Sequence, residues 1–191
     1  GRIHARKYAE DARVTLAGVY DPDDERATEL ANTHGVDSFA SLEALLAAVD
    51  IVTIASPPSF HGATARQTLG AGKHTLVEKP LATDAADGAA LVKLAADKKL
   101  VLACGHQERL VFEAMGLLSA PERPSFIESV REGPWTGRSA DVSVTLDLMV
   151  HDLDLALQLI GGKPDRIEST AKPVHGRTAD QIEVRLAFDG A

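Results

Sequence analysis

The sequence contains very little cysteine, which limits how the chain can be stabilised. Cys104 is the only cysteine among 191 residues, so no disulfide can form within the chain. Disulfides are typical of oxidising compartments, so we expect a cytoplasmic protein in a reducing environment. The contents of apolar (45%) and charged (25%) residues are ordinary for a globular protein, and no repeat or low-complexity segment interrupts the sequence.

Long apolar runs and blocks of basic residues are also missing. No run approaches the ~20 apolar residues that a membrane-spanning helix needs, and no signal peptide is evident, so we expect no membrane partner. The formal net charge is −8, with charges of both signs spread along the chain. Nucleic-acid binding typically uses a basic patch, so the charge pattern argues against a nucleic-acid partner.

The length is sufficient for one domain and part of a second. The chain starts with Gly1 rather than methionine, and it stops at Asp189-Gly190-Ala191, a turn signal directly after a strand-like run. From these two ends we expect a fragment of a longer protein, truncated on both sides.

Short apolar strands alternate with helices through the first half of the chain. The predicted strands cover 14–20, 50–55, 74–77 and 100–103. Residues 1–5 lead into a short predicted helix that ends at about Glu10, and further predicted helices cover 23–34, 42–49, 61–69 and 83–97. Such alternation predicts an α/β fold with a Rossmann-type, doubly wound parallel sheet, which we assign to residues 1–104.

A second domain is predicted over residues 105–191. Helical patterns cover 110–118 and 145–160, strand-like alternation covers 125–132, 166–174 and 181–188, and a loop over 133–141 holds Trp135 and Arg138. This mixture predicts part of an α+β domain.

A charged pair, Glu78 and Lys79, follows directly after the predicted strand at 74–77. In an open α/β sheet, ligands bind at the carboxyl ends of the strands. Pro80 biases Lys79 away from helical backbone and makes a cis peptide bond between them accessible. The position favours a lysine that faces a ligand. The alternative is a surface pair before a proline that starts the next helix.

Gly1 and Asp21 have the spacing of a dinucleotide-binding unit. Such a unit has a strand, a glycine-rich turn, a helix, a second strand and then an acidic residue about 20 positions on. Asp21 ends the predicted strand at 14–20, so Gly1 would be the last glycine of the turn, and the first strand would be missing. The alternative is that Asp21 only caps the following helix.

Asp147 and His151 lie four residues apart on the predicted helix at 145–160, so they share one face. They are either an exposed ion pair, or a histidine acid/base with a carboxylate beside it. His151-Asp152 is also the dyad of metal-dependent HD phosphohydrolases. Those proteins are all-helical and need further ligands on other helices, so we expect no metal site.

Six motifs together give a resemblance that covers essentially the whole chain. They are Gly1-x-x-His4-Ala5, Asp21, Ala55-Ser56-Pro57-Pro58-x-x-His61, Ala71-Gly72-Lys73-His74-x-x-x-Glu78-Lys79-Pro80-Leu81, Gly105-His106-x-Glu108-Arg109 and Asp147-Leu148-Met149-Val150-His151-Asp152-Leu153-Asp154. In these motifs the sequence resembles the family of glucose–fructose oxidoreductase, inositol dehydrogenase and MocA. Its members are nicotinamide-dependent sugar oxidoreductases whose second domain is a mostly antiparallel sheet.

The resemblance implies roles for three catalytic residues. Lys79 would hydrogen-bond and polarise the reacting hydroxyl, His151 would take its proton, and Asp147 would orient the sugar. It also implies a set of cofactor-binding residues: Gly1, Ile3, Asp21, Ser56, Pro57, His61, Glu78 and Lys79. The expected cofactor is NAD rather than NADP, because a carboxylate at Asp21 would repel a 2′-phosphate.

A narrower resemblance, in Phe126-Ile127-Glu128, Arg131, Arg138 and residues 141–149, is to a bacterial subgroup that oxidises the 3-hydroxyl of UDP-N-acetylglucosamine. In that subgroup's pattern, Arg131 or Arg138 would meet the diphosphate, as arginine suits bidentate contacts to anions. The alternatives are an inositol or other polyol dehydrogenase, and a nicotinamide-binding or sensing protein without turnover. We expect a small sugar or nucleotide-sugar partner and a homo-oligomer at full length.

Overall fold

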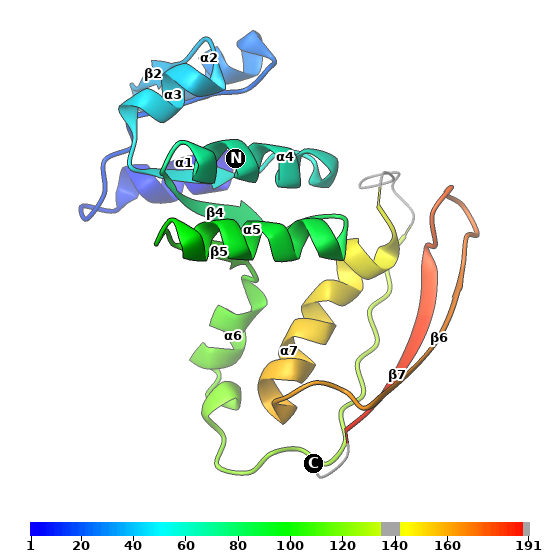
Figure 1. Ribbon diagram of the computed structural model, residues 1–191. Coiled ribbons are helices and arrows are strands. Elements are labelled where there is room, and N and C mark those ends of the chain that lie inside the picture. Colours follow the sequence, from blue (N-terminus) through cyan, green and yellow to red (C-terminus); the bar gives the residue numbers. More distant parts are fainter. Residues whose placement is uncertain (135–141, 189–191) are drawn as a thin grey trace. The chain divides into compact units, whose positions relative to one another are not determined.

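The computed structural model describes residues 1–134 and 142–188 (Figure 1). The predictions made for Trp135, Arg138 and the terminal 189–191 therefore lie outside the described residues. The chain divides into two compact units. Unit 1 comprises Gly1–Ser56, Phe60–Glu78 and Asp84–Ala103, and unit 2 comprises Pro57–Ser59, Lys79–Thr83 and Cys104–Ala191. Lys79 thus belongs to unit 2, although the strand before it belongs to unit 1.

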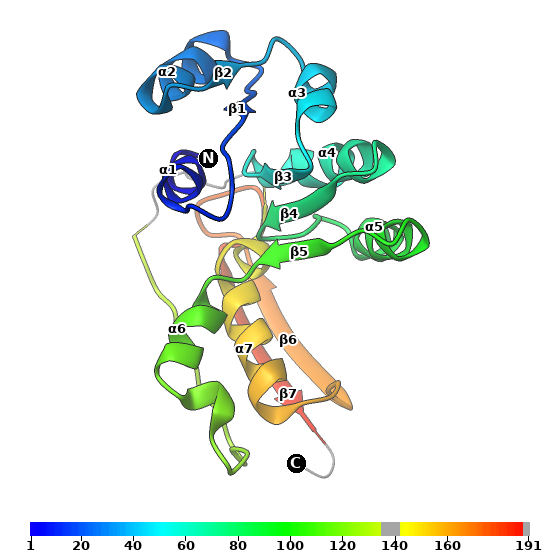
Figure 2. The ribbon, with the colours of Figure 1, turned by 90° about the vertical axis from the view of Figure 1, so that its left-hand side faces the viewer.

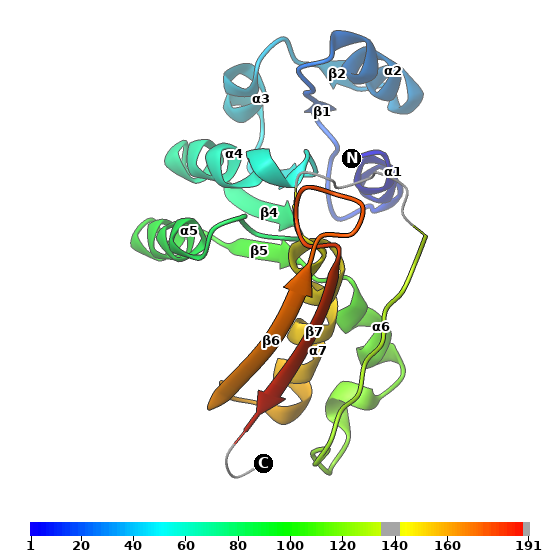
Figure 3. The ribbon, with the colours of Figure 1, turned by 90° about the vertical axis from the view of Figure 1, so that its right-hand side faces the viewer.

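Unit 1 has the predicted alternation of helices and strands, with one short strand, β2, that the sequence did not predict. In chain order they are α1 (Arg2–Glu10), β1 (Gly18–Val19), α2 (Asp24–His34), β2 (Asp37–Ser38), α3 (Leu42–Ala48), β3 (Ile51–Ile54), α4 (Pro58–Gly70), β4 (His74–Glu78), α5 (Ala85–Asp97) and β5 (Leu102–Gly105). The first residues of α4, Pro58 and Ser59, belong to unit 2. The last residues of β5, Cys104 and Gly105, also belong to unit 2. The doubly wound, Rossmann-type arrangement is confirmed. Helices α4 and α5 lie on the same side of the sheet formed by β3, β4 and β5 (Figures 2 and 3).

The strands of unit 1 form two separate sheets. β1 pairs with β2 in parallel, and a second sheet has the order β3-β4-β5, with β3 and β4 parallel in the register Ile51↔His74. The strand predicted at 14–20 is shorter, because β1 covers only Gly18–Val19. A Cβ at Gly18 would lie 2.4 Å from the carbonyl oxygen of Asp37, so glycine allows the close approach of these two short strands.

Alternate residues of β3 and β4 contribute to the core of unit 1. Val52 and Ile54 on β3, and Thr75 and Val77 on β4, are buried. Successive side chains of a strand point to opposite faces, which explains the alternation. Burial of a leucine-sized side chain contributes about 1.5–3 kcal/mol. The helices add buried residues to the core of this unit: Ala65 and Leu69 from α4, and Leu91 and Ala95 from α5.

Polar side chains start three of these helices. The carboxylates of Asp23 and Asp84 and the hydroxyl of Ser41 each accept a hydrogen bond from a backbone N–H in the first turn. Such caps typically contribute about 1 kcal/mol each. The hydroxyl of Tyr8 on α1 is 2.5 Å from that of Thr53, which ties α1 to β3.

Unit 2 is an α+β unit with one hairpin. Its elements are α6 (Glu108–Ala114), a 3₁₀ turn (Leu117–Ser119), a π-helical turn (Thr145–Met149), α7 (Val150–Ile160), β6 (Arg166–Lys172) and β7 (Gln181–Ala187). β6 and β7 pair antiparallel in the register Arg166↔Ala187, and α7 lies alongside this hairpin in all three views (Figures 1–3). The predicted antiparallel sheet is confirmed for this pair.

The strand predicted at 125–132 is wrong, because this segment is extended but belongs to no sheet. A strand needs a neighbour whose backbone can satisfy its hydrogen bonds. Within the described ranges, the side chains of Ser129 and Arg131 instead attach this segment to α6 and α7.

Candidate active site

Lys79 and Asp147 are brought together in unit 2, although 68 residues separate them. The Nζ atom of Lys79 donates hydrogen bonds to the backbone carbonyl of Asp147 at 2.6 Å and to its Oδ1 at 3.0 Å. The side chains are only 18% and 25% exposed. A cis peptide bond joins Lys79 to Pro80. The lysine therefore lies in a fixed, partly desolvated position beside a carboxylate.

Asp147 occupies a π-helical turn rather than the α-helical turn that we predicted. Thr145–Met149 is π-helical, and the α-helical winding of α7 begins only at Val150. In a π-helix the hydrogen bonds run from i to i+5, and such turns occur frequently at functional sites. The wider turn changes the alignment that we expected for Asp147 and His151, which lie four residues apart. The partner that the structure gives to the Asp147 carboxylate is Lys79.

His151 lies in the first turn of α7 and is buried, with 6% of its surface exposed. Its Nδ1 atom has no hydrogen-bond partner within residues 1–134 and 142–188, and lies 3.9 Å from Oε1 of Glu108 on α6. A buried imidazole beside a carboxylate is a common arrangement for a proton acceptor.

Arg131 joins two carboxylates next to His151. Its guanidinium donates to both oxygens of Glu108, at 3.0 and 2.8 Å, and to both oxygens of Asp152, at 3.1 and 3.0 Å. The hydroxyl of Ser129 also donates to Asp152, at 2.8 Å. Burial alone would raise the pKa of Asp152, but the hydrogen bonds from Arg131 and Ser129 lower it below its usual range. These contacts commit most of the donors of Arg131 to carboxylates, which weakens the expectation that it meets a diphosphate.

A second ion pair connects α6 and α7. Arg109 donates through Nε to Oδ2 of Asp154 at 2.6 Å and through Nη2 to Oδ1. The Nδ1 atom of His106 lies 3.6 Å from the same carboxylate. The hydrogen bond to Asp154 raises the pKa of Arg109. Helix α7, which carries His151, is therefore fixed to α6 by the Arg109–Asp154 ion pair and by Arg131, which binds both Glu108 and Asp152.

In unit 1, the structure brings Gly1, Asp21 and Glu78 into one neighbourhood. The carboxylates of Glu78 and Asp21 both lie close enough to the backbone nitrogen of Gly1 to act on it electrostatically. Glu78 also forms a hydrogen bond of 2.6 Å with Nε2 of His4 on α1. Asp21 follows β1 and accepts the N–H of Asp23 at 2.9 Å. Asp21 thus also stabilises the turn before α2.

The loop between β3 and α4 is held by His61. This side chain is 1% exposed, and its Nε2–H donates to the backbone carbonyl of Ser56 at 2.8 Å. Ser56 and Pro57 are themselves exposed on this loop. The predicted cofactor contact of His61 stays a prediction, and the contact that the structure gives it is one that shapes the loop.

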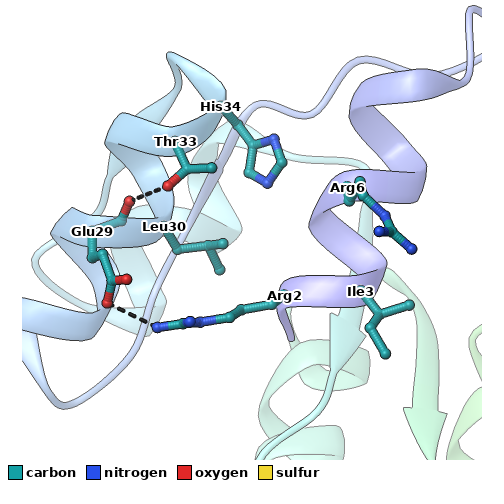
Figure 4. Close-up of a pocket in the computed structure, with 7 residues that line it drawn as sticks. All are labelled: Arg2, Ile3, Arg6, Glu29, Leu30, Thr33 and His34. Atoms are coloured by element: carbon teal, nitrogen blue, oxygen red, sulfur yellow. Dashed lines mark hydrogen bonds and ion pairs between the residues drawn. The ribbon is translucent and has the colours of Figure 1, made fainter.

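Ile3, another predicted cofactor residue, lies on α1 and is exposed. It lines a shallow hollow between α1 and α2 (Figure 4). Arg2 crosses this hollow to Glu29, at 2.8 Å. The remaining lining residues are Arg6, Leu30, Thr33 and His34.

Residues 1–134 and 142–188 contain neither a metal-binding cluster nor a membrane-spanning helix. No group of three or more His, Cys, Asp or Glu side chains there could hold a metal ion. No helix in these ranges is long and apolar enough to cross a membrane.

Sequence reasoning missed the partners of two site residues. The sequence alone assigned no individual role to His4, which pairs with Glu78, or to Glu108, which lies beside His151. Both residues belong to the quoted motifs Gly1-x-x-His4-Ala5 and Gly105-His106-x-Glu108-Arg109, which were the available signal.

An alternating α/β unit with an acidic residue after its first short strand, joined to a lysine–carboxylate pair, has the features of a dinucleotide-dependent oxidoreductase. The comparison with known families agrees. The oxidoreductase family with an NAD-binding Rossmann fold matches residues 1–106, and the chain belongs to this family.

Three relatives illustrate the similarity. UDP-N-acetylglucosamine 3-dehydrogenase from Acidithiobacillus ferrooxidans is 44% identical over 165 residues, which are 86% of this chain and 52% of that protein. A solved structure of that dehydrogenase, GnnA, superposes with a TM-score of 0.90 at 38% identity, over 98% of this chain and 62% of the other.

The second relative is GenD2 from gentamicin A biosynthesis, solved in complex with NAD, with a TM-score of 0.82 at 28% identity over 98% of this chain and 59% of the other. The third is inositol 2-dehydrogenase from Rhizobium meliloti, 28% identical over 90% of this chain and 55% of that protein. The chain thus spans about half the length of the curated relatives it matches.

Proposed function

We propose that the complete protein containing this chain transfers hydride between a nucleotide-sugar carbon and NAD, with the 3-hydroxyl of UDP-N-acetylglucosamine as the best candidate. The observation that carries the proposal is the pair of hydrogen bonds from Lys79 to Asp147, which fixes a cationic donor directly after β4. The 44% identity to a UDP-N-acetylglucosamine 3-dehydrogenase supports this choice of substrate.

The residues of unit 1 fit NAD. α1 begins at Arg2, with Gly1 as its N-cap, and has neither a side-chain cap nor an acidic residue in its first turn, so its N–H groups suit a pyrophosphate. The carboxylate of Asp21, after β1, suits the hydroxyls of a ribose. Ile3, Ser56, Pro57, His61 and Glu78 are proposed to complete the site. Bound NAD supplies the acceptor for the hydride.

Lys79 is proposed to stabilise the reacting oxygen. Its ammonium group lies beside Asp147 and donates hydrogen bonds to the backbone carbonyl and to Oδ1 of that residue. A further contact to the substrate hydroxyl would polarise it and stabilise negative charge as its proton leaves. Asp147 keeps the ammonium group oriented and contributes to holding the sugar.

His151 is proposed as the base. As hydride leaves the sugar carbon, the imidazole takes the hydroxyl proton, and the carbon becomes a ketone. The imidazolium then returns the proton to solvent. Burial of the ring beside Glu108 is consistent with this role. Groups in such roles typically contribute 10²–10⁴-fold to the rate.

A polyol dehydrogenase is the second candidate, favoured by the similarity to inositol 2-dehydrogenase. A nicotinamide-binding or sensing protein without turnover is the third, because one fold can host both kinds of function. We further propose that the complete protein acts in the cytoplasm as a homo-oligomer, which fractionation and light scattering would test.

The discriminating experiment is a turnover assay with the complete protein. Reduced nicotinamide is followed by its absorbance after mixing with NAD and either UDP-N-acetylglucosamine or myo-inositol. Turnover with the nucleotide sugar, and at least about tenfold lower kcat/KM with inositol, supports the proposal. The reverse preference favours the polyol dehydrogenase, and NAD binding without turnover on either substrate favours the sensing protein.

A further inference from the structure

Glu108 has a position that its ion pair with Arg131 alone does not explain. Its Oε1 atom lies 3.9 Å from Nδ1 of the buried His151, and this nitrogen has no hydrogen-bond partner among the residues that the structure describes. A buried polar atom without a partner costs about 1–3 kcal/mol, so a conformation that supplies the missing acceptor is favoured.

The gap is small enough for a side-chain movement to close. A hydrogen bond from nitrogen to oxygen is about 2.9 Å long, so a shift of about 1 Å is sufficient. Catalytic hydrogen bonds are often long in a ligand-free protein and shorten when substrate binds. A carboxylate has about four acceptor positions on its two oxygens. The two hydrogen bonds from Arg131 therefore leave Oε1 able to accept another.

We propose that Glu108 is the positioning residue of the proposed base: it accepts the Nδ1–H of His151, while Arg131 holds the Glu108 carboxylate in place. This inference rests on the proposed function of His151. With the proton kept on Nδ1, the opposite nitrogen Nε2 is the one that takes the substrate proton. The imidazolium formed in that step is then stabilised by the negative charge of Glu108.

Arg131 provides the rigidity that this role needs. Its planar guanidinium donates to both oxygens of Glu108, a bidentate geometry that fixes the carboxylate plane. The same guanidinium holds Asp152, the residue after His151 on α7. One side chain thus fixes both the carboxylate and the helix that carries the imidazole. It also offsets part of the negative charge.

Several charged groups act on this imidazole. Glu108 approaches from α6 and Arg131 from the extended segment at 125–132, whereas Asp152 is adjacent on α7. Asp147 precedes it in the π-helical turn, and its charge is paired with Lys79. Removing one charge from this set moves the titration of His151 in a direction that depends on the sign of the charge.

Opposite charge changes therefore test the proposal. In the complete protein, Glu108→Gln keeps the size of the side chain but removes the anion that favours the imidazolium. Arg131→Met removes the cation and leaves both carboxylates uncompensated. Arg109→Met is the matched control. It removes the arginine that pairs with Asp154, and so breaks the second charged contact between α6 and α7.

The first readout needs no turnover. Histidine ring protons are titrated by NMR without cofactor, and His151 is assigned by its loss in His151→Gln. We expect the midpoint of the His151 titration to fall by about 1 pH unit in Glu108→Gln, to rise in Arg131→Met and to stay unchanged in Arg109→Met. Midpoints that stay unchanged in the first two variants, or shift in the same direction, overturn the proposal.

The second readout is the pH profile of sugar oxidation. In Glu108→Gln we expect kcat to fall about 10- to 100-fold with little change in KM, and the acid limb to move to lower pH. Loss of activity at every pH with an unmoved limb indicates a purely structural role and overturns the proposal. If Glu108→Gln does not fold, the upward midpoint shift in Arg131→Met alone decides.

A wild-type protein that oxidises no sugar contradicts the proposed function of His151. The NMR midpoints would still report whether Glu108 acts on the imidazole, so the two failures are distinguishable.

Discussion

At the scale of single residues, Asp147 contacts the ammonium group of Lys79 through two different atoms, one of the backbone and one of the side chain. The backbone carbonyl of Asp147 accepts the shorter of its two hydrogen bonds, at 2.6 Å, and the carboxylate accepts the longer, at 3.0 Å. Truncation of the Asp147 side chain therefore removes only one of these two contacts. We therefore expect Lys79→Ala and Asp147→Ala to have different effects on turnover.

Lys79→Ala in the complete protein should lower kcat about 10²–10⁴-fold, because it removes the donor to the reacting oxygen. Steady-state formation of reduced nicotinamide measures the loss. Lys93→Ala is the control, since Lys93 forms an exposed pair with Asp97 on α5 and should leave the rate nearly unchanged. Near-normal turnover of Lys79→Ala would show that this lysine is not catalytic.

Asp147→Ala should lose less turnover than Lys79→Ala and should mainly raise KM. The carbonyl of residue 147 still accepts a hydrogen bond from Lys79, so the ammonium stays near its position. The same assay, run over a range of sugar concentrations, separates kcat from KM. A loss of kcat as large as that of Lys79→Ala would assign Asp147 a direct role in the chemistry.

Asp21 should decide the choice of cofactor. Its carboxylate would accept the ribose hydroxyls of NAD and repel the 2′-phosphate of NADP, so kcat/KM should be higher with NAD. Asp21→Ala should narrow the difference between the two cofactors. Equal or better efficiency of the unmodified protein with NADP would contradict this assignment, with Arg26 as the nearest cation in sequence able to explain it.

Lys79 and Asp147 stand out in the sequence because both lie in distinctive motifs, and the structure brings them into contact, while their catalytic roles stay predictions. The contacts of Glu108 and His4 could not be predicted, because an ion pair between distant segments leaves no periodic pattern. Arg131 shows the same limit. An arginine in an extended segment suggested an anion ligand, whereas folding gave it Glu108 and Asp152 as partners.

At the scale of elements, the long helix predicted over 145–160 is divided into a π-helical turn and α7. Apolar periodicity is similar in both, so the sequence could not distinguish them. The strand at 14–20 shortened to Gly18–Val19 for a related reason: β-propensity predicts extended backbone, but pairing requires a neighbour. Helix starts were more predictable, since caps such as Ser41 act locally.

The β6–β7 hairpin depends on a carboxylate. Asp180 accepts the N–H groups of Gly176, His175 and Val174, at 2.8, 2.6 and 2.7 Å. The hydrogen bond from Gly176, together with those from His175 and Val174, lowers the pKa of Asp180. A lowered folded-state pKa stabilises the folded connection above the ordinary carboxyl pKa, and this contribution is lost as pH falls through the lowered value.

Asp180→Asn should therefore speed hydrogen exchange of the amides at 174–176, measured near neutral pH by mass spectrometry. The wild-type protein should show a matching loss of protection only under acidic conditions, after correction for the intrinsic pH dependence of exchange. Exposed Asp37→Asn on β2 provides the control. Unchanged protection of 174–176 in Asp180→Asn would mean that the backbone alone holds this connection.

At the scale of the whole chain, unit 1 has two sheets that do not pair. Within the described residues, β1 pairs only with β2, and β3 only with β4. Ile51 on β3 is 57% exposed, which is unusual for an apolar strand residue in a doubly wound sheet. Unpaired strand edges leave backbone N–H and C=O groups without partners in a sheet, and we expect this to weaken a dinucleotide site built on them.

We therefore expect the bare 191-residue chain to bind NAD weakly and to unfold at low denaturant concentration. Isothermal calorimetry and urea titration measure the two properties. The complete protein is the reference for both. Micromolar or tighter binding of NAD by the 191-residue chain would contradict the expectation and show that these two sheets suffice for the site.

The central claim is that hydride leaves a sugar carbon of a nucleotide sugar while Lys79 stabilises its oxygen. The most direct measurement uses UDP-N-acetylglucosamine deuterated at the carbon that bears the 3-hydroxyl, with NAD and the complete protein. We predict that deuterium appears in the reduced nicotinamide, detected by mass spectrometry, and that Lys79→Ala slows its appearance about 10²–10⁴-fold. Reduced nicotinamide without deuterium, or deuterium transfer at an unchanged rate in Lys79→Ala, would contradict the account.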